Sequence, residues 1–233
     1  MILNSFKLNT VIVQLQYADA FELWDNAGAI GRQLCAIWPG LKVVEGQPQN
    51  QTLKANGVTI RTGFSVSTIT LSNLTSLESK INQVQETFDV WRKMLALGEV
   101  KRISTRGIHV KEFLSMKDAN AELFSFNLVR WPTTKVFDQP LEAELNGVEM
   151  LYRFEDRNSF SVLRLKAERL EYEAELNTDF FEEPAIHKSK NHLVIDFDRG
   201  LLGTINADKF RMDDWLKGYQ HVLRRDIEKV IKD

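Results

Sequence analysis

The fold follows from the stretch Phe64–Phe113, in which residues 71–98 read LSNLTSLESKINQVQETFDVWRKMLALG. Thr75 and Glu78 have the spacing of a capping box, which predicts the start of a helix, and Gly98 predicts its end. Apolar residues recur between them at helical spacing, which is typical of one buried face; they are Leu77, Ile81, Val84, Phe88, Trp91 and Leu95. Strands are predicted on both sides of this helix, over 64–71 and 102–113.

The same order of elements is predicted twice along the chain, with the two halves meeting near Gly98. The first half has a strand over 11–17, a helix over 19–38, strands over 41–45, 51–55, 58–61 and 64–71, and a helix over 76–97. The second has a strand over 102–113, a short helix over 115–125, a meander over 141–145, 148–154, 160–176 and 193–197, and a helix over 207–231. We therefore predict an α+β fold: a curved, mostly antiparallel sheet with helices on one face. Its pseudo-duplicated lobes, residues 1–98 and 99–233, would pack as one unit.

Single residues sharpen these boundaries. Asp19 and Asn206 are the expected N-caps of the first and last helices. Asn56-Gly57 predicts a hairpin with a type I′ turn. Apolar parity switches near Glu168, which predicts a bulge or bend. Four tryptophans fall on helical apolar stripes and are expected in the core: Trp24, Trp38, Trp91 and Trp215.

Composition is that of a protein able to bury a core, with 43% hydrophobic and 27% charged residues in 233. The formal charge of −2 predicts no global attraction to nucleic acid or anionic lipid. Cys35 is the single cysteine, so no intramolecular disulfide can form. No segment has the pattern of a signal peptide or a membrane span, so a cytoplasmic location is expected.

Three stretches resemble a poorly characterised bacterial family of sporadically distributed proteins of about this length. They are the strand and helix from Val11, the tract from Leu71 to Val110, and the closing strand Leu193–Asp198 with the helix after it. Where members commonly have a Gly-Leu-Arg-Tyr-like run, this chain has Gly107-Ile108-His109-Val110. The resemblance implies no catalytic residue, and such a patchy distribution is typical of genes on mobile or defence islands. The order of elements also resembles the duplicated saddle of TATA-binding protein and, more distantly, the helix-grip fold, which implies a fold and no function.

The strand over 102–113 carries the first candidate site. Arg102 and Arg106 share parity and would project from one face, where two guanidiniums could grip a phosphate or carboxylate. His109 joins them if Gly107 breaks the alternation. The alternative, which we favour, is a solvated or charge-protected face.

Arg130 and Trp131 form the second candidate, because Arg beside Trp in a predicted loop has the composition of an interface hot spot. A Trp131 lid packed over the sheet is an equal alternative.

Asp196 and Asp198 share a strand face and could hold Mg²⁺ or act as acid and base, although a charged strand end is the favoured interpretation. No spacing predicts a zinc site, so surface histidines are expected.

The chain lacks the short signatures of phosphate-binding loops, serine hydrolases, zinc proteases and dinucleotide enzymes. We therefore expect a non-enzymatic protein, with no cofactor, metal or catalytic residue, that binds a macromolecular partner, in the first place a protein. An accessory or neutralising role in a bacterial defence or toxin system is the narrower hypothesis. Nucleic-acid or small-anion binding by the sheet, which the net charge does not favour, and a metal-dependent enzyme are the alternatives. The sequence is compatible with a homo-oligomer and predicts no membrane partner.

Overall fold

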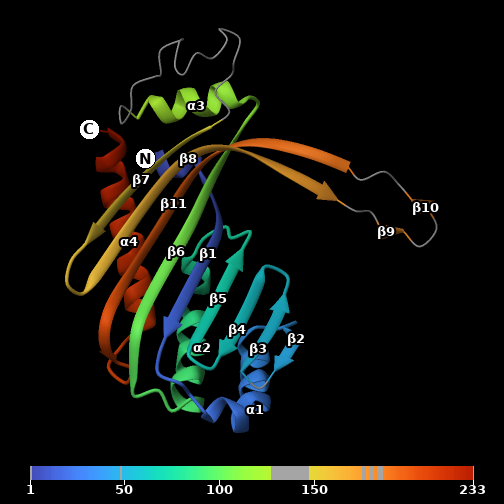
Figure 1. The fold of residues 1–233 in the computed structure, drawn as a ribbon, viewed down its shortest axis with the longest axis vertical. Helices are drawn as coiled ribbons and strands as arrows, with labels where there is room; N and C mark the ends of the chain where they lie inside the picture. Colours follow the sequence, from blue (N-terminus) through green and yellow to red (C-terminus); the bar gives the residue numbers. More distant parts are fainter. Residues whose placement is uncertain are drawn as a thin grey trace.

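The computed structural model describes residues 2–47, 49–126, 147–174, 177–178, 181–182 and 186–232. Within them, nine strands form one antiparallel sheet in the order β2-β3-β4-β5-β1-β6-β11-β8-β7 (Figure 1). In that order the strands are Lys42–Gln47, Asn50–Ala55, Val58–Gly63, Val66–Ser72, Lys7–Gln16, Glu99–Phe113, Ile186–Asn206, Ser159–Ala174 and Val148–Glu155. The short strands β9 (Asn177–Thr178) and β10 (Phe181–Glu182) form a separate pair.

Four α-helices pack against this sheet: α1 (Glu22–Ile37), α2 (Ile81–Met94), α3 (Met116–Phe124) and α4 (Met212–Lys232). A 3-10 turn, η1 (Ile2–Ser5), precedes β1. Along central strands such as β1, buried residues alternate with less buried ones. These buried residues and the buried stripes of the helices form one continuous core, so the helices lie on one face of the sheet. None of the described helices is long and apolar enough to cross a membrane.

The strand order has the symmetry of a duplication. In each half the first strand lies at the centre of the sheet, the chain passes through a helix to the edge, and a meander then returns strand by strand towards the centre. β1 and β6 therefore pair antiparallel in the middle, with Val13 opposite Thr105. The α+β class, the antiparallel sheet, the helices on one face and the pseudo-duplicated order are confirmed. The strand predicted over 141–145 lies outside the described residues.

Three tryptophans lie in the core as predicted, and each donates a hydrogen bond to a threonine. The indole N–H groups of Trp38, Trp91 and Trp215 donate to Thr87, Thr62 and Thr105 at 2.8, 2.8 and 2.9 Å. A buried indole needs such an acceptor, because an unpaired N–H would cost about 1–3 kcal/mol.

The helix predicted from the capping box starts later than expected. Ser76 Oγ, and not Thr75, accepts the backbone N–H of Glu78 at 3.1 Å. The chain then makes a 3-10 turn, η2 (Glu78–Lys80), before α2 begins at Ile81. The prediction of a Thr75 cap was wrong because the neighbouring serine offers a competing local acceptor.

The end of this helix also differs from the prediction. α2 ends at Met94, and Ala96 adopts a positive φ of 50°. The backbone N–H of Leu97 donates to the carbonyl of Arg92 at 2.9 Å, so an alanine fills the left-handed position that usually favours glycine. Gly98 lies beyond this turn and does not terminate the helix.

Two predicted N-caps are not used by their helices. α1 begins at Glu22, after Asp19, without a side-chain cap. Asn206 Oδ1 accepts the backbone N–H of Lys209 at 3.0 Å and so closes a turn, while α4 begins further on, at Met212. In both cases the side-chain oxygen accepts a hydrogen bond in a local turn, or faces solvent, before the helix begins.

Side chains also close two other turns, and Asn56-Gly57 forms a turn where one was predicted. Ser115 caps α3 by accepting the Asp118 N–H at 3.1 Å, and Asp156 accepts two backbone N–H groups in the β7–β8 turn. Asn56-Gly57 forms the β3–β4 turn, but Gly57 has a positive φ, 72°, and Asn56 does not, so the type I′ geometry is not adopted.

A bulge or a bend was predicted near Glu168. The β8–β11 ladder contains no bulge, and both strands turn away from the sheet (Figure 1). The pairing runs without a register shift from Ser159–Leu201 to Ala174–Ile186. Past Glu168 the two strands extend beyond the rest of the sheet as a two-stranded arm (Figure 1).

Candidate functional site

The two faces of β6 separate the residues of the first candidate site. Arg102 and Arg106 project from the face opposite the helices, which we call the helix-distal face. His109 lies opposite Ile195, a core residue, and therefore projects towards the helices. Gly107 does not break the alternation, so His109 does not lie beside the two arginines.

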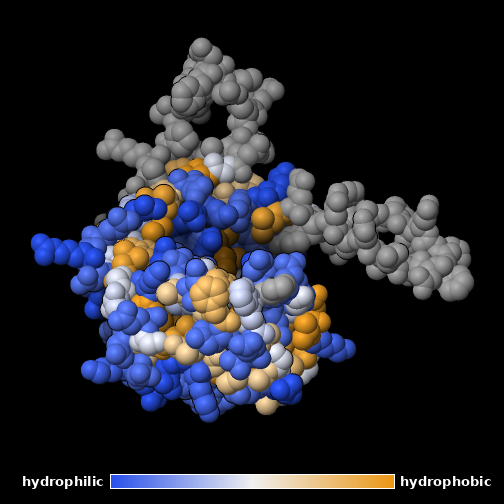
Figure 2. All heavy atoms as spheres, turned by 60° about the horizontal axis from the view of Figure 1, so that its bottom comes forward, coloured by the Kyte–Doolittle hydropathy of each residue, from blue (hydrophilic) through white to orange (hydrophobic). Residues whose placement is uncertain are grey.

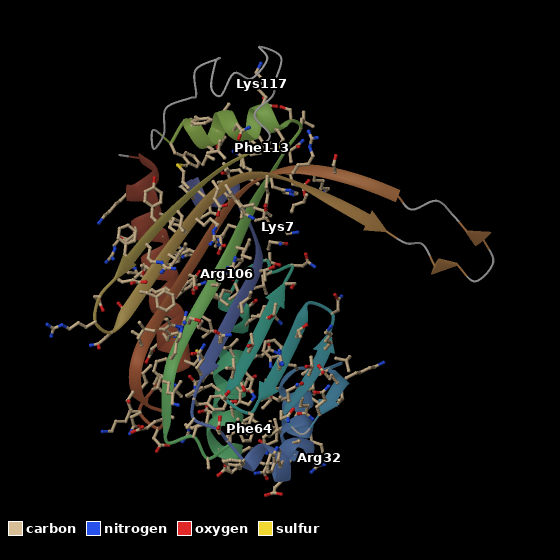
Figure 3. The ribbon with its side chains drawn as sticks, in the orientation of Figure 1. Lys7, Arg32, Phe64, Arg106, Phe113 and Lys117 are labelled. Carbon is tan, nitrogen blue, oxygen red and sulfur yellow. The ribbon has the colours of Figure 1, made fainter. Side chains whose placement is uncertain are left out.

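Arg106 is held by a carboxylate of the same chain. Its Nε and Nη2 donate to Asp196 Oδ1 and Oδ2 at 2.8 and 2.6 Å, a bidentate pair near the middle of the sheet (Figure 3). Arg164 Nη1 donates to the same Asp196 Oδ2 at 2.9 Å and its Nε contacts Glu149 at 2.7 Å. The Asp196 side chain is 4% exposed, and hydrogen bonding to it raises the pKa of Arg106. A phosphate would have to compete with Asp196 for this guanidinium.

Arg102 lies against an aromatic ring. Its Cζ is 4.6 Å from the centroid of the buried Phe160 ring, a cation–π contact. Among the described residues its Nε has no hydrogen-bond partner, and the same is true of Asp198 Oδ1. Burial raises the pKa of Asp198, while the neighbouring charges of Arg102 and Arg106 act in the opposite direction.

The Phe160 ring can reach Arg102 because Gly200 has no side chain. A Cβ at Gly200 would overlap the Phe160 ring and lie 2.8 Å from the backbone oxygen of Ile103. We expect Gly200→Ala to lower the free energy of unfolding by about 2 kcal/mol, since overpacking a rigid site typically costs about 1–3 kcal/mol. Urea denaturation measures this loss.

Gly218→Ala on α4 is the matched control for that substitution. Nothing lies within 4 Å of the position that a methyl group would take there, so alanine should leave stability unchanged or raise it by up to about 1 kcal/mol through helix propensity. Equal losses at Gly200 and Gly218 would contradict the overlap argument.

The helix-distal face carries compensated charge around this cluster. Arg106 and Arg164 pair with Asp196, Arg164 also with Glu149, and Asp198 faces Arg102. The metal alternative needs converging ligands, but nowhere in the described chain do three or more His, Cys, Asp or Glu residues gather as a metal site would require.

Two histidines are buried, against expectation. His109 is 9% exposed, and burial lowers its pKa to about 4. His192 is 3% exposed. His192 lies on β11, which begins well before the strand predicted over 193–197, and His109 lies on the helix-facing side of β6. Arg130 and Trp131, the second candidate pair, lie outside the described residues.

The structure contains an exposed aromatic cluster that the sequence did not predict. Phe21, Trp24 and Phe64, which we call the aromatic surface, pack on one another where α1 begins and where the chain passes from β4 to β5. Trp24 and Phe64 are stacked with centroids 5.8 Å apart, and Phe21 meets both edge-on at 5.4 and 4.8 Å. Phe21 is 57% exposed and Trp24 is 56% exposed.

The prediction that Trp24 is a core residue was therefore wrong. The buried stripe of α1 runs through Leu23, Ile30 and Leu34, and Trp24 is rotated about 100° from Leu23. The spacing of Phe21 and Trp24, three residues apart and off this stripe, was the available signal. In a view tilted towards this end, the surface is mostly hydrophilic and carries several separate apolar patches (Figure 2).

These features define the chain as an α+β protein with one duplicated antiparallel sheet, a charge-compensated helix-distal face and an exposed aromatic surface at one end. No protein-family model matches the chain, and no match was found among curated proteins. The family resemblance noted in the sequence stays a prediction.

Proposed function

We propose that this chain is a non-catalytic protein that binds a partner protein through the aromatic surface. The observation that carries the proposal is the contact of three aromatic side chains, two of them more than half exposed. Single exposed apolar residues are ordinary on protein surfaces, whereas a contiguous exposed cluster is typical of an interaction site.

The packing of the cluster favours binding. The rings support one another at centroid distances of 4.8–5.8 Å, so their rotamers are restricted before a partner arrives. Little side-chain entropy would then be lost on association. Tryptophan is enriched among interface hot spots, where truncation to alanine costs about 2 kcal/mol or more.

The alternative function, in which the helix-distal face binds an anion or a nucleic acid, has less support. Asp196 already occupies Arg106 and contacts Arg164, so the positive charge available to a phosphate is small. A role in a bacterial defence or toxin system is a narrower form of the proposal, and the genes beside this one would test it.

We expect Trp24→Ala and Phe21→Ala to weaken partner binding about 30-fold each, the equivalent of about 2 kcal/mol. The tagged chain would be captured from cells that express it natively, and the recovered protein purified and titrated against each variant by calorimetry. Both substitutions are at exposed positions, so thermal unfolding should change little.

Phe154→Ala is the matched control, because Phe154 on β7 is also 57% exposed and lies outside the aromatic surface. A partner that binds the wild type, Trp24→Ala and Phe154→Ala equally would overturn the proposed surface. Failure to recover any stoichiometric partner at high protein concentration would overturn the proposed function.

A further inference from the structure

We infer that the partner docks on the aromatic surface with lysine or arginine side chains. This inference rests on the proposed function and names the chemistry of the partner. It comes from the negatively charged side chains beside the aromatic surface.

Three carboxylate side chains lie next to Phe21 and Trp24 along the chain, at and just before the start of α1. Asp19, Glu22 and Asp25 are all exposed, and none of them makes an ion pair with another described residue. They alternate with Phe21 and Trp24 in the same helical turn and the approach to it. None of these carboxylates forms an ion pair within the described residues, and Glu22 and Asp25 lie in the first turn of α1, where the helix dipole also favours negative charge.

Two basic residues lie nearby and do not cancel this charge. Arg32 is on α1, two turns after Asp25, with its Nη1 3.7 Å from the position that a Cβ of Gly28 would take. It lies at the same end of the molecule as Phe64 (Figure 3). Lys93, at the end of α2, precedes Met94, whose carbonyl accepts a hydrogen bond from Asn26 at 2.9 Å. Three carboxylates against one guanidinium and one ammonium leave an excess of negative charge.

The helix-distal face shows the opposite arrangement. There the carboxylates of Asp196 and Glu149 are paired with arginines within 3 Å. Those two carboxylates are paired within the chain, whereas the carboxylates around the aromatic surface are available to a partner.

Aromatic ring faces and carboxylates both attract cationic groups. A guanidinium or ammonium is attracted to a Trp or Phe ring face, and each exposed carboxylate adds an attraction that salt screens. Acidic surroundings repel phosphate, so this chemistry favours a basic protein segment over a nucleic acid or an anionic membrane.

Hexaarginine is the probe for this inference and hexaglutamate its charge-reversed control. We expect hexaarginine to bind the wild type, and isothermal titration calorimetry measures this binding in the wild type and in every variant. Trp24→Ala should weaken binding at least 10-fold. Glu22→Gln/Asp25→Asn should weaken it about 5-fold at low salt, which corresponds to about 1 kcal/mol, and should reduce the salt dependence.

Glu86→Gln is the matched control, because Glu86 is an exposed helical glutamate on α2 without an ion pair among the described residues. It should change hexaarginine binding less than 2-fold. Equal losses in Glu86→Gln and Glu22→Gln/Asp25→Asn, binding of hexaglutamate, or no binding of hexaarginine would overturn the inference.

The captured partner separates this inference from the proposed function. If the partner loses affinity with Trp24→Ala but not with Glu22→Gln/Asp25→Asn, and salt has no effect, aromatic docking stands and cationic recognition is wrong. If both variants weaken it and salt weakens the wild type, the inference is supported.

Discussion

Replacing Arg106 with methionine is expected to lower the free energy of unfolding by about 3 kcal/mol. Asp196 is 4% exposed and receives two of its charge-assisted hydrogen bonds from Arg106. Removing one partner of a buried ion pair typically costs about 3–5 kcal/mol, because the remaining charge stays desolvated. Here Arg164 still contacts Asp196, which favours the lower end of that range. Urea denaturation at pH 7.5 measures the loss.

Two further variants make this expectation specific. Arg164→Met removes one bond to Asp196 and leaves the bidentate pair, so it should cost about 1–2 kcal/mol. Combining Arg106→Met with Asp196→Asn should recover part of the Arg106→Met loss, because the buried charge is then gone. Additive losses in the double variant, or a loss at Arg164 equal to that at Arg106, would contradict the assignment of Asp196 as the buried charge that needs Arg106.

The duplicated order of elements was predictable because its signals are local. Apolar periodicity along 71–98 and the alternation of residues 102–113 need no knowledge of distant contacts. Helix ends were less accurate, since Ser76 competes with Thr75 for the same turn and Ala96 takes a backbone conformation that glycine usually fills.

The partner of Arg106 could not be predicted from local pattern. Asp196 is 90 residues away along the chain and comes to Arg106 through the pairing of β6 with β11. The sequence placed two arginines on one strand face and two aspartates on another. These side chains form a charge-compensated cluster only through the register of β6 against β11, which depends on tertiary structure and not on local sequence.

The aromatic surface was missed for a different reason. Helical periodicity identifies which residues are buried and gives no sign of which exposed aromatic residues meet. Trp24 was assigned to the stripe although it lies beside Leu23 and not in line with it. Phe64, from the β4–β5 connection, completes the cluster and shares no local pattern with α1.

Lowering the pH from 7.5 to 5.0 is expected to remove about 2 kcal/mol of stability through His109 alone. Burial lowers the pKa of His109 to about 4, below its ordinary value of 6.5. Between these values the unfolded chain binds a proton that the folded chain does not, so stability falls as the pH falls from about 6.5 towards 4. Each pKa unit corresponds to about 1.4 kcal/mol, and pH 5.0 covers most of the interval.

His109→Gln isolates this contribution. The difference in unfolding free energy between pH 7.5 and 5.0 should be about 2 kcal/mol smaller in the variant than in the wild type, whatever the variant's stability at pH 7.5. Asp198 acts in the opposite direction, because burial raises its pKa and the folded state takes up its proton more readily as the pH falls. Since both proteins contain Asp198, its effect cancels in the comparison. Identical pH dependence in the two proteins would mean that His109 is hydrated in solution, and that the core does not close over the helix-facing side of β6.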